Sequence, residues 1–142
     1  MITKIPIQVI KIENEGSHLI IQGNINKNKC YLIIDTGASK SVFNRKLSDS
    51  MKEENINLNI HDLHTTTLYS DDIPSISGII KEFQIGTLCK YNYEVTFIDI
   101  DYINKLYQDT VGKKIDGLIG NDLLVAHKAI IDYADKSLIL TY

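Results

Sequence analysis

The sequence lacks two features that define common classes of partner. It has no apolar run long enough to cross a membrane, since the longer runs, at 30–34 and 123–126, cover only a few residues. It has no excess of positive charge: 18 Asp and Glu outnumber 15 Lys and Arg, and the net charge is −3. A surface of this sign is not suited to neutralising phosphates. We therefore expect neither a membrane nor a nucleic acid as partner.

Cysteine is also scarce, and its scarcity bears on location. Cys30 and Cys89 are the only two in the chain, and free thiols are typical of a reducing compartment. The first residues, Met-Ile-Thr-Lys-Ile-Pro, contain no basic segment followed by an apolar one, as a secretion signal would. The expected location is cytoplasmic. A single disulfide between the two cysteines is the open alternative.

The composition is that of an ordinary folded domain. The chain has 142 residues, of which 44% are hydrophobic and 23% are charged. This excludes a disordered chain, a collagen-like chain and a coiled-coil rod. The length allows one domain, spanning residues 1–142, with a core large enough to fold without a metal or disulfide.

Hydrophobic periodicity predicts mostly strands. Apolar residues alternate or cluster over short stretches bounded by turn residues, at 5–12, 18–22, 30–34, 56–60, 63–69, 76–83, 91–98, 129–133 and 138–142. Helical spacing or polar composition favours short helices at 44–54, 101–108 and 121–128, with Asp101 and Asn121 as N-caps and Gly112 as the end of the second. The predicted fold class is all-β, mainly antiparallel, with one or two short helices.

One segment, Leu-Ile-Ile-Asp-Thr-Gly-Ala-Ser at 32–39, carries chemistry. Asp35 ends an apolar strand, where a carboxylate is costly unless it is paired or used. Gly37 allows another backbone to approach closely, and the hydroxyls of Thr36 and Ser39 can hold a carboxylate in place. The structural alternative is a strand that ends in an Asx-type turn.

A second motif, Leu118-Ile119-Gly120, follows later and precedes a short helix. Together the two motifs resemble those of the aspartic peptidases of the pepsin–retropepsin clan, in which an Asp-Thr/Ser-Gly loop is followed by apolar-apolar-Gly. In the order and size of its segments the chain is similar to the single-lobe, retropepsin-like branch, including small bacterial members. The resemblance implies a closed acid-protease barrel.

The resemblance also implies roles for individual residues. Asp35 would be the catalytic carboxylate, and Thr36 would hydrogen-bond to the same loop of a partner subunit. Gly37 would let the substrate backbone come near, and Ala38 and Ser39 would continue the loop. Leu118, Ile119 and Gly120 would pack under this loop. The hairpin tip would act as a flap, comprising Tyr69, Ser70, Asp71, Asp72 and Ile73.

One motif supplies one carboxylate, so the second must come from elsewhere. Asp116-Gly117 lacks the hydroxyl residue between Asp and Gly, and we interpret Asp116 as a turn residue. The resemblance then implies a two-fold homodimer. Its function would be that of an aspartic endopeptidase, which hydrolyses peptide bonds with a water activated by the paired Asp35 carboxylates. This chemistry needs no metal and no cofactor, and the substrate is a peptide or protein.

Two departures from retroviral members lead to further expectations. Ser39 stands where those members carry an acidic residue, and Asn121 stands where they carry arginine, so a neutral Ser39–Asn121 hydrogen bond would replace an ion pair. The tip at 70–75 lacks glycine and is acidic. This motivates the alternative of a catalytically inactive dimerisation or peptide-binding module. A small β-barrel binding protein, in which Asp-Thr-Gly is only a turn, is the third hypothesis.

The chain ends are candidates for an inter-subunit sheet, which the resemblance to retropepsin-like dimers implies. The candidate segments are the first strand and Leu138, Ile139 and Leu140.

Overall fold

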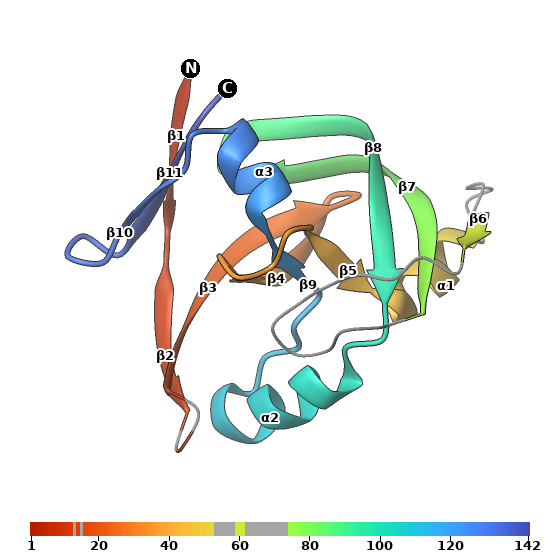
Figure 1. Cartoon of the computed structure of the whole chain (residues 1–142), viewed down its shortest axis with the longest axis horizontal. Coiled ribbons are helices and arrows are strands. Elements are labelled where there is room, and N and C mark those ends of the chain that lie inside the picture. Colours follow the sequence, from red (N-terminus) through yellow and green to blue (C-terminus); the bar gives the residue numbers. More distant parts are fainter. Residues whose placement is uncertain (13, 15, 53–58, 62–73) are drawn as a thin grey trace.

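The computed structural model describes residues 1–12, 14, 16–52, 59–61 and 74–142 (Figure 1). Within these ranges the chain forms strands and three helices, in the following order: β1 (Ile2–Pro6), β2 (Gln8–Ile12), β3 (Gly16–Ile25), β4 (Asn28–Ile34), β5 (Val42–Asn44), α1 (Arg45–Lys52), β6 (Asn59–His61), β7 (Ser75–Ile85), β8 (Leu88–Ile98), α2 (Asp101–Val111), β9 (Gly117–Ile119), α3 (Asn121–Ala126), β10 (Ile130–Asp132) and β11 (Ser137–Thr141). The strands predicted at 76–83 and 91–98 form the longer β7 and β8. The strand predicted at 63–69 lies outside the described residues.

The larger sheet closes on itself, as predicted. Its strands follow the order β2-β3-β4-β9-β5-β8-β7-β6, and an additional pairing of β3 with β7 joins Asn24 to Gln84 and Ile25 to Phe83. Most neighbours are antiparallel, but β4 pairs with β9 and β5 with β8 in parallel. Fully buried Phe43, Phe83 and Phe97 lie in the core. The all-β prediction and the closed barrel are therefore confirmed.

The chain ends form a separate three-stranded sheet, in the order β1-β11-β10 (Figure 1). The chain passes from this sheet to the barrel at Ile7, whose N–H donates to the carbonyl of Lys136 at 2.8 Å. Strand β11, which contains Leu138, Ile139 and Leu140, pairs with β1 on one side and with β10 on the other. The edges of this sheet are therefore β1 and β10.

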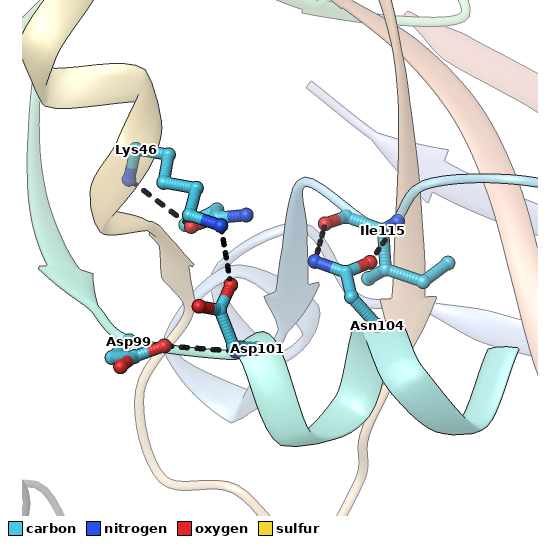
Figure 2. A network of polar contacts seen from close by, with 6 residues as sticks. Lys46, Asp99, Asp101, Asn104 and Ile115 are labelled. Carbon is cyan, nitrogen blue, oxygen red and sulfur yellow. Dashed lines mark hydrogen bonds and ion pairs between the residues drawn. The ribbon is translucent and has the colours of Figure 1, made fainter. Parts of the chain in front are cut away.

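Helix α2 covers a second hydrophobic cluster outside the barrel. Ile103 and Tyr107 of this helix are buried against residues from β2, β3, β4 and β9. Asn104 fixes the helix to the segment before β9: its Nδ2 donates to the carbonyl of Ile115 at 3.2 Å, and the Ile115 N–H donates to its Oδ1 at 2.7 Å (Figure 2). The helix ends at Gly112 with φ 64°, as predicted. This anchor sets the position from which β9 enters the barrel.

Both predicted N-caps are wrong by one residue. The N-cap of α2 is Ile100 and that of α3 is Gly120. Asp101 lies inside its helix, where its N–H donates to Asp99 Oδ1 at 2.9 Å and its carboxylate pairs with Lys46 Nζ of α1 at 3.0 Å (Figure 2). The carboxylate thus pairs with Lys46 on another helix, a contact that the local sequence does not reveal. None of the described helices is long and apolar enough to span a bilayer.

Candidate active site

Asp35 lies where β4 ends, at the side of the parallel strand β9. Its N–H donates to the carbonyl of Ile119 at 2.9 Å, which carries the β4–β9 pairing one residue beyond the strand. Its side chain is only 6% exposed. Oδ1 accepts the N–H of Gly37 at 3.0 Å, whereas the buried Oδ2 has no hydrogen-bond partner among the described residues. An unpartnered buried carboxylate oxygen is costly, and such atoms are typical of reactive sites.

The loop after Asp35 turns sharply and exposes its polar residues. The Ala38 N–H donates to the Asp35 carbonyl at 3.2 Å, and Ala38 itself is fully buried. Thr36, Gly37 and Ser39 are exposed. The methyl group of Ala38 thus anchors the loop in the core, while the Thr36 hydroxyl and the Gly37 backbone lie at the surface beside the carboxylate.

The apolar-apolar-Gly motif lies directly against this loop. Leu118 and Ile119 are almost completely buried in β9. A Cβ atom on Gly120 would lie 2.6 Å from the carbonyl carbon of Lys40 and 2.9 Å from the carbonyl oxygen of Ala38. These are backbone atoms that cannot move aside cheaply, so glycine is required here for the loop to pack.

Asn121 holds the loop from the other side. Its N–H donates to the Ala38 carbonyl at 2.9 Å, and its Nδ2 donates to the Thr36 carbonyl at 2.7 Å. The side-chain amide therefore bonds to the backbone of the loop, and not to the Ser39 hydroxyl as expected. The expectation was wrong because Ser39 is exposed, whereas the Thr36 carbonyl is an acceptor within reach.

Two further residues of the site were not foreseen from the sequence. Oδ1 of Asp122 accepts the N–H of Ser41 at 2.8 Å, the Ser41 hydroxyl at 2.7 Å and the N–H of Leu123 at 2.9 Å. The Ser41 oxygen in turn accepts the Gly120 N–H at 2.9 Å. The only sequence signal is an acidic residue in the first turn of a short helix, which by itself indicates no contact with a distant loop.

Asp116 is occupied in a different way. Its Oδ2 accepts the N–H of Tyr31 at 3.0 Å, its own N–H donates to the Tyr31 carbonyl at 2.8 Å, and its carbonyl accepts the Asn44 N–H at 2.7 Å. Burial raises the pKa of its carboxyl above 3.8, against the lowering effects of the Tyr31 N–H and Lys114. Tyr31 precedes Asp35 by four strand positions, about 13 Å. Asp116 therefore has a structural role, as expected, but it lies in an extended segment directly before β9 and not in a turn, and it is too distant to pair with Asp35.

The flap residues expected from the resemblance, Tyr69, Ser70, Asp71, Asp72 and Ile73, lie outside the described residues. The strands on either side of that segment are described. β6 and β7 pair antiparallel, with Ile60 opposite Ile76. The flap assignment stays a prediction.

A surface depression of about 260 Å³ adjoins the loop that follows Asp35. Its lining comes from the loop, from α3 and from the segment that leads into the terminal sheet: Thr36, Asn121, Leu124, Val125, Lys128, Ala129 and Ile131. Val125 of α3 is 74% exposed, and Ile131 contributes a residue of β10 to the lining. The surface beside Thr36 is therefore partly apolar and continuous with the edge strand β10.

Other groups in the described part of the chain offer no competing chemistry. Burial raises the pKa of the Cys30 thiol to about 12, so it stays protonated and is a poor nucleophile. No three His, Cys, Asp or Glu side chains in the described ranges are grouped so that they could hold a metal ion. Asp35 is thus the group in this part of the chain best placed for reaction.

Comparison with known families agrees with this geometry. A model of the aspartyl protease family matches residues 21–123, which include both motifs. The chain belongs to this family. A search of curated proteins gave no match.

Two solved structures have the same fold as this aspartyl protease family member. A retropepsin-like aspartic protease from Rickettsia conorii is 19% identical with a TM-score of 0.53, covering 100% of this chain and 92% of that one. The retroviral protease-like domain of Ddi1 from Leishmania major is 16% identical with a TM-score of 0.54, and 87% of each chain is covered. The retropepsin-like fold expected from the two motifs is therefore confirmed.

Proposed function

We propose that this protein is an aspartic endopeptidase that acts as a homodimer, with Asp35 of each subunit in one shared active site. The observation that carries the proposal is the buried Asp35 carboxylate, which has one oxygen held by the Gly37 N–H and the other without a partner among the described residues. The exposed Thr36 and Gly37 beside it leave room for a second loop. Membership of the aspartyl protease family supports the same reaction.

The proposed mechanism needs two carboxyl groups that share one proton, because two close carboxylates do not both ionise easily. The ionised group takes a proton from a water molecule, whose oxygen attacks the carbonyl carbon of the scissile bond. The protonated group donates its proton to the carbonyl oxygen. When the C–N bond breaks, a proton passes to the leaving nitrogen, and the products are a carboxylic acid and an amine.

A second copy of the chain is the proposed source of the other carboxylate. Asp116 lies beside Tyr31, too far from Asp35 to act as the second carboxylate. Oδ1 of Asp122 already accepts three hydrogen bonds. A two-fold axis beside Thr36 would bring the two Asp35 loops together with one self-complementary surface. The depression lined by Thr36 and Val125 gives that surface its apolar part.

The terminal sheet limits how such a dimer can form. Leu138, Ile139 and Leu140 lie in β11, which has neighbours on both sides within its own subunit. A strand of the partner therefore cannot pair directly with β11 while this sheet is intact, and β11 would join an inter-subunit sheet only through β1 or β10. Strands β1 and β10 keep an open edge, and β10 is the one that adjoins the depression.

The cytoplasmic location is part of the same proposal. It is supported by Cys30 and Cys89, which are both free thiols.

The test combines cleavage of a peptide library with subunit mixing. The wild-type protein should cut peptides, and Asp35→Asn should not. When an equal amount of D35N is added to a fixed amount of wild type and the subunits exchange, random pairing should lower activity to about half. Unchanged activity on mixing would mean that one chain suffices. Peptide binding without cleavage by the wild type would favour an inactive binding module, and a strict monomer would argue against the shared site.

A further inference from the structure

The contacts made by α3 and the residues before it show a feature that a helix start alone does not explain. Asp122 Oδ1 accepts the N–H of Leu123, one residue away, which is an ordinary local bond at a helix start. The same oxygen also accepts both the N–H and the hydroxyl of Ser41, a residue 81 positions earlier in the chain. Two of its three hydrogen bonds therefore hold the end of the catalytic loop.

Ser41 connects this carboxylate to the apolar-apolar-Gly motif. Its side chain is buried at 5% exposure, and its oxygen both donates to Asp122 and accepts the N–H of Gly120. The donors and acceptors thus run in one direction, from the Gly120 N–H through the Ser41 hydroxyl to the Asp122 carboxylate. A carboxylate only accepts hydrogen bonds, so it fixes the orientation of the hydroxyl proton and leaves the serine oxygen free to accept.

This chain of hydrogen bonds begins at Gly120, the residue after the one that bonds to the backbone of Asp35. The carbonyl of Ile119, which precedes Gly120, accepts the Asp35 N–H at 2.9 Å. Any shift of Gly120 relative to the loop must therefore also move the Ile119 carbonyl, which holds the backbone of Asp35 in place. The close approach of Gly120 to the Ala38 and Lys40 backbone leaves little slack for compensation.

We propose that Ser41 and Asp122 are positioning residues, which hold the Asp35 carboxylate in the geometry that catalysis requires. Neither touches the reacting atoms. Their effect on turnover rests on the proposed peptidase function, whereas their effect on loop order does not. Displacement of a catalytic group by about 1 Å can cost about 100-fold in rate, so a modest loosening of this loop is sufficient to be measured.

The experiment compares four single variants, and the cleavage assay adds the double variant that combines Ser41→Ala with Asp122→Ala. Ser41→Ala removes the hydroxyl, and Asp122→Ala removes the acceptor. Asp122→Asn keeps an oxygen that accepts all three bonds but loses the charge. Ser48→Ala is the matched control, because Ser48 is also a buried serine, at 1% exposure, whose hydroxyl bonds within α1 to the Arg45 carbonyl, away from the loop.

The first readout is amide hydrogen exchange, which needs no activity. S41A and D122A should each speed exchange at the amides of Asp35, Gly120 and Asn121 by about 10-fold, the loss of roughly one hydrogen bond. S48A should leave these amides unchanged, and D122N should stay close to wild type. Equal exchange in S41A, D122A and S48A would overturn the proposal. A D122N variant as loose as D122A would also contradict it, because charge and not hydrogen bonding would then matter.

The second readout is peptide cleavage. In S41A and D122A we expect kcat to fall by about 10-fold or more, with KM within about twofold, since substrate contacts are kept. The double variant should lose little beyond the larger single loss, because both changes break one chain of bonds. Independent, additive losses would contradict this. A wild-type protein without cleavage would reject the peptidase function alone, and the exchange data would still decide the positioning role.

Discussion

Two short segments of this protein, Asp35-Thr36-Gly37 and Asp116-Gly117, lie at the ends of the parallel strands β4 and β9 and differ in how their carboxylates are bonded. Asp35 follows β4 and leaves one buried oxygen without a partner in the described part of the chain. Asp116 precedes β9, and its carboxylate accepts a hydrogen bond from the backbone N–H of Tyr31. Both are aspartates with a glycine one or two residues later, at an end of one of these strands. What separates them is whether the neighbouring backbone satisfies the carboxylate or leaves it available.

The largest difference between the two should appear in activity. Asp35→Asn removes the carboxylate that exchanges a proton, and cleavage should fall at least about 1,000-fold. Asp116→Asn keeps an oxygen acceptor for the Tyr31 N–H and should cut within about threefold of wild type. Steady-state cleavage of one peptide by the three proteins checks this. Equal losses in both variants would erase the distinction.

Replacing glycine with alanine should cost more stability at the two ends of β9 than at a position where a Cβ atom has free space. Gly120→Ala and Gly117→Ala both place a Cβ against backbone, near Lys40 and at 2.6 Å from the Val42 carbonyl respectively. Each should lower the free energy of unfolding by about 3 kcal/mol. Urea denaturation measures the loss.

Gly112→Ala is the control for those two substitutions. Nothing lies within 4 Å of its Cβ position, and the only cost is its φ of +64°. We expect a loss of about 1 kcal/mol. A loss at Gly120 no larger than that at Gly112 would mean that the loop adjusts freely.

For stability the order of the two aspartates should be reversed: Asp116 should contribute more to the free energy of unfolding than Asp35, although Asp35 contributes more to activity. Asp116→Ala leaves the partly buried N–H of Tyr31 without its side-chain acceptor, and the free energy of unfolding should fall by about 2 kcal/mol. Asp35→Asn exchanges a buried, half-satisfied carboxylate for a neutral group and should not lower the thermal midpoint. Thermal and urea denaturation of both variants test the order. A more damaging D35N would contradict it.

The smallest expected effect is on the pH dependence of stability. Burial raises the pKa of Asp116 above its value of 3.8 in the unfolded chain. Between 3.8 and that higher value the folded state binds more protons than the unfolded state, so this group makes stability fall as pH rises. Asp116→Asn removes the effect. The unfolding free energy of wild type minus that of D116N should therefore decrease with rising pH, and a constant difference would refute the assignment.

Much of the fold was open to prediction because the decisive signals are local. The apolar run at 30–34 that ends in Asp35 predicted β4 and its loop, and Gly112 predicted the end of α2. The predicted N-caps, Asp101 and Asn121, are instead the first residues of their helices, and their side chains have partners from other elements. Lys46 pairs with Asp101, and the Thr36 carbonyl accepts from Asn121. Competition between local capping and distant contacts is decided only in the folded chain.

The sequence by itself determined the family motifs, the β-rich class and the choice of Asp35 as the candidate catalytic residue, since apolar periodicity and the Asp-Thr-Gly and Leu-Ile-Gly segments are written in consecutive residues. Only the tertiary structure decided that Asp116 faces Tyr31, that β11 is enclosed within its own sheet, and that Ser41 meets Asp122. The first and third depend on the parallel register of β4 and β9, which brings together residues 85 and 81 positions apart. The second depends on the antiparallel pairing of β11 with β1 and β10. No local pattern encodes that pairing, because chain packing selects it through the shared core.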